Sequence, residues 1–177
     1  MFEADRSIGR ISLANLLAAE PARSPDPRLT VADLAHEVAA AKRHFVDPSL
    51  AVAALRATPE RLLQDLNLFG FLFESLAIRD LRVYAQSTDA QVLHYHDSDG
   101  LEVDAIVQAA GGPWAAFEIK LRPGQVDAAA KSLLKFAKRI DTEKCGQPAA
   151  LGVIVGTGYG YVRDDGIQVI PIGAMGP

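Results

Sequence analysis

Residues 101–120, LEVDAIVQAAGGPWAAFEIK, constrain the fold of this 177-residue chain more than any other stretch. The stretch contains two runs in which apolar residues alternate with others, and the alternation matches the two-residue repeat of a β-strand. Gly111, Gly112 and Pro113 separate the two runs, and residues of this kind mark a tight turn. We therefore predict a β-hairpin with one face in the core and a site on the other.

The same alternation places polar side chains together. In the first strand Asp104 shares a face with Glu102, and in the second Glu118 and Lys120 share a face with Trp114. Paired strands lie about 4.8 Å apart, so Asp104 is expected to face Glu118, with Lys120 two residues further along. Two close carboxylates repel each other unless a cation lies between them, and their oxygens suit Mg²⁺ or Mn²⁺. A lysine beside such a metal can hold a water molecule or offset phosphate charge.

A helix is predicted over residues 70–85, just before these strands. Phe71, Glu74, Ile78 and Leu81 fall on one stripe of that helix. A carboxylate on an apolar stripe is costly unless it is paired, protonated or bound to a cation, which makes Glu74 a candidate site residue. The alternative is a glutamate that borders the core without a function.

These residues resemble the D…(D/E)-x-K core of the PD-(D/E)xK nuclease superfamily, with Asp104 first and Glu118-Ile119-Lys120 after the turn. The segments 70–74 (GFLFE), 95–104 (YHDSDGLEVD) and 117–120 (FEIK) also resemble a nuclease-like domain of unknown function at the C-terminus of many prokaryotic AAA-type ATPases. The resemblance covers residues 41–177.

The resemblance implies a restriction-endonuclease-like fold and a Mg²⁺- or Mn²⁺-dependent nuclease acting on DNA. In that mechanism Asp104, Glu118 and the carbonyl of Ile119 hold the metal, Lys120 positions the water, and Glu74 is a third carboxylate. The alternative is a non-catalytic module that binds DNA or a partner such as an AAA-type ATPase.

Residues 1–40 are expected to be a helical extension, which resembles the segment after the nucleotide-binding core of those ATPases. The sequence contains no Gly-x-x-x-x-Gly-Lys-Ser/Thr phosphate loop. By this resemblance the chain is an abbreviated relative without the ATPase core, and its expected partners are DNA and an AAA-type ATPase or a second copy of itself.

A second helix is predicted over residues 126–140, and its basic residues gather on the face opposite its apolar one. With Arg122, they form a candidate surface for the phosphate backbone of DNA. The alternative for this surface is an ordinary solvated helix face. Its candidate nucleic-acid-binding residues are Arg122, Lys131, Lys135, Lys138 and Arg139.

The order of elements predicts an α/β sandwich with a mixed central sheet flanked by helices. Short helices are expected after Asp47-Pro48 and Thr58-Pro59, and strands over residues 92–96, 149–155, 161–163 and 167–172. His94 and His96 share a strand face, as in either a transition-metal site or a plain surface pair.

Composition indicates more about the location of the protein than about its activity. A net charge of -4 gives no overall basic signature, so a nucleic acid would have to be held by a local patch and by metal. A single cysteine cannot form an internal disulfide, and no apolar run is long enough to span a membrane. We expect a cytoplasmic protein without a membrane contact.

Overall fold

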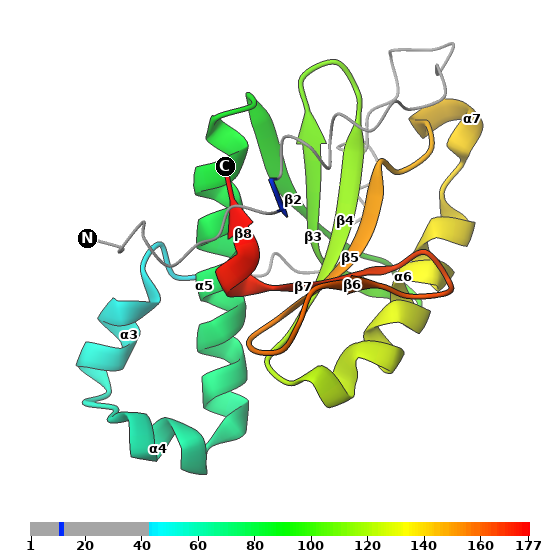
Figure 1. The fold of residues 1–177 in the computed structure, drawn as a ribbon. Helices are drawn as coiled ribbons and strands as arrows, with labels where there is room; N and C mark the ends of the chain where they lie inside the picture. Colours follow the sequence, from blue (N-terminus) through cyan, green and yellow to red (C-terminus); the bar gives the residue numbers. More distant parts are fainter. Residues whose placement is uncertain (1–10, 13–42) are drawn as a thin grey trace.

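The computed structural model describes residues 11–12 and 43–177, and its centre is a six-stranded mixed sheet (Figure 1). The strand order is β2-β3-β4-β5-β7-β6. Neighbouring strands are antiparallel at β2-β3, β3-β4 and β7-β6, and parallel at β4-β5 and β5-β7. The strands span Ala90–His96 (β2), Glu102–Ala109 (β3), Trp114–Lys120 (β4), Ala150–Val155 (β5), Tyr161–Val162 (β6) and Gln168–Pro171 (β7).

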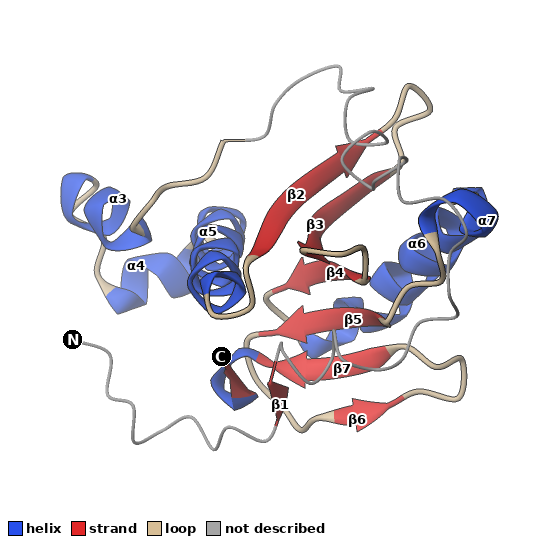
Figure 2. Ribbon diagram, turned by 90° about the horizontal axis from the view of Figure 1, so that it is seen from above, coloured by secondary structure: helices blue, strands red, loops and turns tan. Residues whose placement is uncertain are grey.

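Helices cover both faces of this sheet, which confirms the predicted α/β class (Figure 2). One face carries the long helix α5, with the short helices α3 and α4 beside it, and the other carries α6, which crosses from β4 to β5. The helices span Pro48–Ala54 (α3), Pro59–Gln64 (α4), Leu66–Gln86 (α5), Val126–Arg139 (α6) and Thr142–Cys145 (α7), and short 3₁₀ turns span Pro123–Gln125 and Ile172–Ala174.

The short helices begin where the sequence predicts. The Asp47 carboxylate accepts a hydrogen bond from the backbone N–H of Ser49 at 2.9 Å, and the Thr58 hydroxyl accepts one from Arg61 at 3.3 Å. Each cap is followed by a proline in the first turn, where the missing N–H breaks no helical hydrogen bond. These two helices therefore start for local reasons that the sequence contains.

Both faces of the predicted hairpin are buried, which corrects the expectation of one core face and one site face. Ala115, Phe117 and Ile119 pack in the core under α5, as expected for the apolar face. However, Trp114 is fully buried in the other core, under α6, where its indole N–H donates to the carbonyl oxygen of Cys145 at 3.0 Å. The charged residues of the strand pair, Glu102, Asp104, Glu118 and Lys120, all lie at one end of it.

The long helix α5 buries most of the predicted stripe, with Phe71 as the exception. Ile78 and Leu81 are buried, but the Phe71 side chain is 68% exposed, because α5 extends beyond the sheet at its N-terminal end, where α3 and α4 flank it. Ile11–Ser12 (β1), within the expected helical extension, form a short strand parallel to Met175–Gly176 (β8). The rest of the extension, residues 1–10 and 13–40, lies outside the described residues.

Candidate functional site

The register of β3 and β4 brings Asp104, Glu118 and Lys120 together. Ala105 pairs with Phe117, so the next pair in the antiparallel register is Asp104 with Glu118. The Lys120 ammonium lies 2.9 Å from Asp104 Oδ2 and 2.5 Å from Glu118 Oε2. The same Asp104 oxygen accepts a hydrogen bond from the backbone N–H of Ile119 at 2.8 Å. The three predicted side chains therefore form one contiguous ionic cluster.

Burial and close charges shift the pKa values of Glu118 and Lys120 in this cluster. The side chains of Asp104 and Glu118 are 7% and 6% exposed. Burial and the neighbouring Asp104 carboxylate raise the pKa of Glu118 from 4.5 to about 7, against the opposing effect of Lys120. Burial alone would lower the pKa of Lys120, but the two carboxylates raise it above its usual value. Two acids and one base thus share a site with a surplus of negative charge.

The donor set fits a hard divalent cation. Two carboxylates converge on one positive group, and oxygen ligands of this kind are those that Mg²⁺ and Mn²⁺ prefer. Among residues 11–12 and 43–177, no group of three or more His, Cys, Asp or Glu side chains is arranged to hold one metal ion. A metal here would therefore be held by Asp104 and Glu118, with backbone or water oxygens completing its shell.

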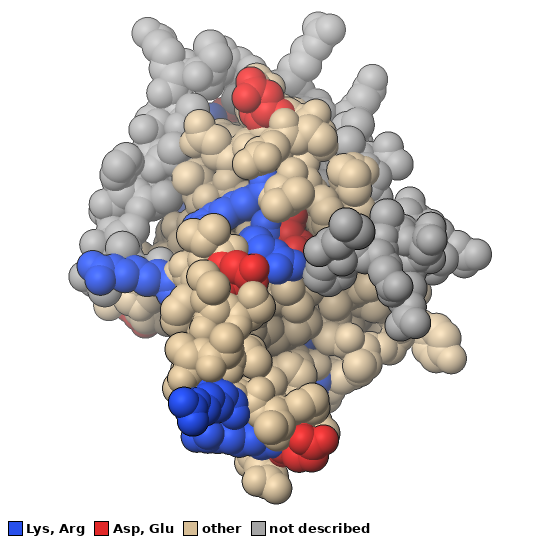
Figure 3. All heavy atoms as spheres, turned by 90° about the vertical axis from the view of Figure 1, so that its left-hand side faces the viewer, with Lys and Arg blue, Asp and Glu red and all other residues tan. Residues whose placement is uncertain are grey.

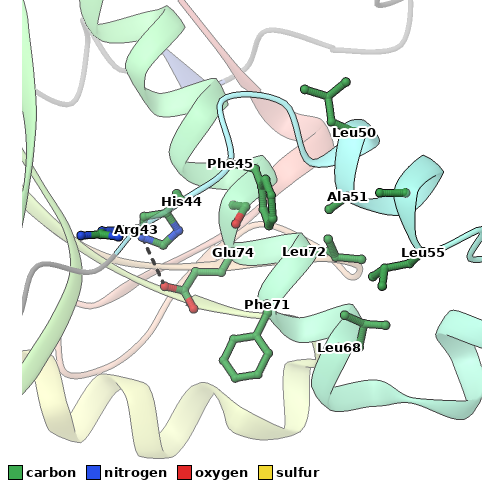
Figure 4. Close-up of a pocket in the computed structure, with 12 residues that line it drawn as sticks. Arg43, His44, Phe45, Leu50, Ala51, Leu55, Leu68, Phe71, Leu72 and Glu74 are labelled. Carbon is green, nitrogen blue, oxygen red and sulfur yellow. Dashed lines mark ion pairs between the residues drawn. The ribbon is translucent and has the colours of Figure 1, made fainter.

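Glu74 lines a cavity between α3 and α5 and approaches His44, which the sequence patterns did not single out. The Glu74 Oε1 and His44 Nε2 atoms are 3.8 Å apart, and both side chains are nearly buried (Figure 4). His44 precedes the first predicted helix and belongs to no periodic pattern, so only the tertiary contact identifies it. The prediction that Glu74 serves the carboxylate cluster as a third acid stays a prediction.

Packing connects the first half of α5 to the end of β4. A Cβ atom built on Gly156 would lie 3.6 Å from the ring of Phe73, the neighbour of Glu74. The same atom would lie only 2.8 Å from the carbonyl oxygen of Leu121, the residue after Lys120. The first half of α5 and the end of β4 therefore meet through Gly156.

The candidate phosphate-binding residues Arg122, Lys131, Lys135, Lys138 and Arg139 are all exposed. Arg139 also forms ion pairs with Asp97 and with Asp99, the latter at 3.0 Å, so its charge is already engaged by the turn after β2. Of the two histidines on β2, His94 pairs with a carboxylate rather than with the other histidine. Its Nε2 atom lies 3.1 Å from Glu102 Oε1 on β3.

The fold and the cluster together define an α/β domain with a buried carboxylate–lysine site at the end of two adjacent strands. Residues 69–175, more than half of the chain, match the family described as a domain of unknown function, DUF4143. The chain belongs to this family, and the match includes Glu74, Asp104, Glu118 and Lys120 but not His44. Searches of curated proteins and of solved structures gave no match.

In the part of the chain that the structure describes, no helix is long and apolar enough to cross a lipid bilayer.

Proposed function

We propose that this domain is a Mg²⁺- or Mn²⁺-dependent phosphodiesterase of the PD-(D/E)xK type that acts on DNA. The observation that supports the proposal is the Lys120 ammonium, which lies within 2.9 Å of Asp104 and 2.5 Å of Glu118. The two carboxylates and the lysine are thus the residues that the nuclease pattern requires, gathered at one point. The metal, when bound, would polarise the phosphate and lower the pKa of a water molecule.

Each residue then has a distinct task. Asp104 and Glu118 hold the cation, and the Ile119 N–H fixes the orientation of the Asp104 carboxylate through its 2.8 Å hydrogen bond. Lys120 moves from the carboxylates toward the attacking water or the scissile phosphate, because its long side chain is flexible and 27% exposed. Glu74, on α5, serves as the third carboxylate of the nuclease pattern.

A second candidate is a non-catalytic module that binds a partner such as an AAA-type ATPase. One observation favours it, namely the large exposed apolar side chains on α3, α4, the start of α5 and the residues that flank α3. In Figure 3, which looks onto this side of the molecule, charged side chains form only a few groups within a mostly uncharged surface. The exposed apolar residues are Phe45, Val46, Leu50, Leu55, Leu63, Leu66 and Phe71.

Cleavage assays with matched variants test the first proposal. Purified wild-type chain is incubated with single- and double-stranded DNA in Mg²⁺, in Mn²⁺ and in chelator, and we expect cleavage only with metal. Asp104→Asn and Glu118→Gln should weaken metal binding as measured by calorimetry, whereas Lys120→Met should abolish cleavage and leave metal binding in place. Lys144→Met, an exposed lysine on α7 that the candidate DNA-binding surface does not include, is the control.

Two outcomes would decide between the candidates. Cleavage that survives in Asp104→Asn would exclude the proposed metal site. Absence of cleavage under every metal condition, together with binding of a partner that is lost when exposed leucines such as Leu50 are changed to serine, would favour the module instead.

A further inference from the structure

The glycine-rich link between β5 and β6, residues 156–160 (GTGYG), begins beside the carboxylate–lysine site of Asp104, Glu118 and Lys120. Val155, the last residue of β5, pairs with Lys120, the last residue of β4, in a parallel register. The links from β5 to β6 and from β4 to α6 therefore leave from the same end of the sheet (Figure 1). In open α/β sheets, ligands bind beyond this end, outside the carboxyl ends of the parallel strands.

Two glycines of this link pack against the residues that follow Lys120. A Cβ atom built on Gly156 would lie 2.8 Å from the carbonyl oxygen of Leu121. One built on Gly158 would lie 3.8 Å from Cγ of Pro123. Pro123 is three residues after Lys120, and three residues span at most about 11 Å. The middle of the link therefore lies alongside the chain that leaves the carboxylate–lysine site.

Two tyrosines of the same segment are exposed to solvent. Tyr159 is 89% exposed, the largest value among the large apolar and aromatic side chains that the structure describes, and Tyr161 at the start of β6 is 52% exposed. Just after β6, Arg163 pairs with Asp127 in the first turn of α6 at 2.5 Å, so the segment is fixed at both ends. A tyrosine has only two side-chain torsions, so a ring on a fixed backbone loses little conformational entropy when a flat ligand stacks on it.

The charges and the neighbours of Tyr159 favour a nucleic-acid strand as the ligand. Arg122, in the segment against which the link packs, is exposed, and Lys120 is 27% exposed, so positive charge is available for phosphates. Gly158 and Gly160 flank Tyr159, so no adjacent side chain covers the faces of its ring. Proteins bind single strands with this combination, in which cations follow the backbone and aromatic rings stack on the bases.

We propose that Tyr159 stacks on an unpaired base of the DNA strand whose phosphate lies at the carboxylate–lysine site. This inference rests on the proposed function and names its substrate class, single-stranded or locally unpaired DNA. Inside a duplex, neighbouring base pairs cover both faces of each base, so an internal paired base offers no face to the ring.

The test uses the full chain and a short single-stranded DNA that carries 2-aminopurine, whose fluorescence reports stacking. Affinity is measured in chelator, where no cleavage is expected, and cleavage in Mg²⁺ is followed separately on gels. A stacked base contributes about 1–3 kcal/mol, so Tyr159→Ala should weaken binding roughly 5- to 150-fold and reduce the fluorescence change. Tyr159→Phe keeps the ring and should bind like the wild type.

Val83→Ala is the matched control, since Val83 is 54% exposed but lies on the second half of α5. Tyr159→Ala should unfold at the same urea concentration as the wild type, because its side chain is almost wholly exposed. A duplex of the same sequence should bind the wild type more weakly than the single strand does, and Tyr159→Ala should bring the two affinities close together.

Three results would overturn the inference. The first is unchanged single-strand affinity in Tyr159→Ala, and the second is an equal loss of affinity for the single strand and the duplex. The third is a loss of self-association in Tyr159→Ala, measured by sedimentation, with unchanged affinity for the oligonucleotide, because the ring would then belong to a contact between two copies of the chain.

The two proposals fail in different ways. Cleavage with wild-type affinity in Tyr159→Ala would refute the stacking role and leave the phosphodiesterase standing. Single-strand binding that depends on Tyr159, without cleavage in any metal, would support the stacking role and refute the catalytic role of Asp104, Glu118 and Lys120.

Discussion

Replacing Lys120 with methionine removes the cation that lies between two buried carboxylates. Methionine nearly preserves the length and apolar stem of lysine, so the main loss is the ammonium group 2.9 Å from Asp104 and 2.5 Å from Glu118. Leaving a buried charge without its partner costs about 3–5 kcal/mol. Because the lysine side chain is 27% exposed, we expect the lower end of this range: Lys120→Met should lower the free energy of unfolding by about 3 kcal/mol at pH 8.5.

The size of this loss should depend on pH. Burial and Asp104 already raise the pKa of Glu118 to about 7, so at pH 5.5 this group is largely neutral in the folded wild type. A proton on Glu118 removes one of the two like charges, and Lys120→Met should then cost only about 1 kcal/mol. Urea unfolding at pH 5.5 and pH 8.5 measures both values.

A divalent metal ion should partly restore the stability of Lys120→Met. Mg²⁺ can take the place of the missing ammonium between Asp104 and Glu118, so 10 mM Mg²⁺ should stabilise Lys120→Met more than the wild type at pH 8.5. Lys135→Met, on the exposed face of α6, is the control and should change stability by less than about 0.5 kcal/mol. A loss below about 1 kcal/mol at pH 8.5, or one equal at both pH values, would refute this electrostatic account.

Three further predictions concern stability. The pKa of Glu118 in the folded protein, about 7, lies above its ordinary 4.5, so between these pH values the folded protein binds a proton that the unfolded chain does not. As pH rises from 4.5 to 7, the free energy of unfolding of the wild type should therefore fall, relative to Glu118→Gln, by at most about 3 kcal/mol. A rise would contradict the burial argument. Trp114→Phe leaves a cavity and the Cys145 carbonyl oxygen without the indole donor, so denaturant unfolding should show a loss of about 3 kcal/mol, and a loss under 1 kcal/mol would contradict tight packing. Gly156→Ala forces a contact of 2.8 Å with the Leu121 carbonyl oxygen and should lower the thermal midpoint with a cost of about 1–3 kcal/mol, whereas Gly70→Ala meets no atom within 4 Å and should be neutral or stabilising.

Local sequence patterns determined most of the elements and the centre of the candidate site. The alternation of residues 101–120 and the Gly111-Gly112-Pro113 turn specify a hairpin and its register, because each depends on neighbours in the chain. Once that register is set, Asp104 faces Glu118, and Lys120 follows on the same face. The helix starts at Asp47 and Thr58 are equally local, since a cap needs only the next three residues.

Contacts between distant segments decided the rest. Burial of Trp114 depends on α6, which packs over the hairpin face that the sequence left for a site. The engagement of Arg139 by Asp97 and Asp99 joins residues about 40 positions apart, so a basic helix face in the sequence gave no sign of it. Exposure of Phe71 follows from the extension of α5 beyond the sheet, which periodicity cannot show.

The pairing of His44 with Glu74 was decided in the same way, by the cavity that α3 and α5 form together. The sequence by itself thus determined which residues alternate, turn and cap, because these properties act over a few positions. Only the tertiary structure decided which faces are covered and which charges meet, because burial and ion pairing depend on the approach of segments that the chain order does not bring together.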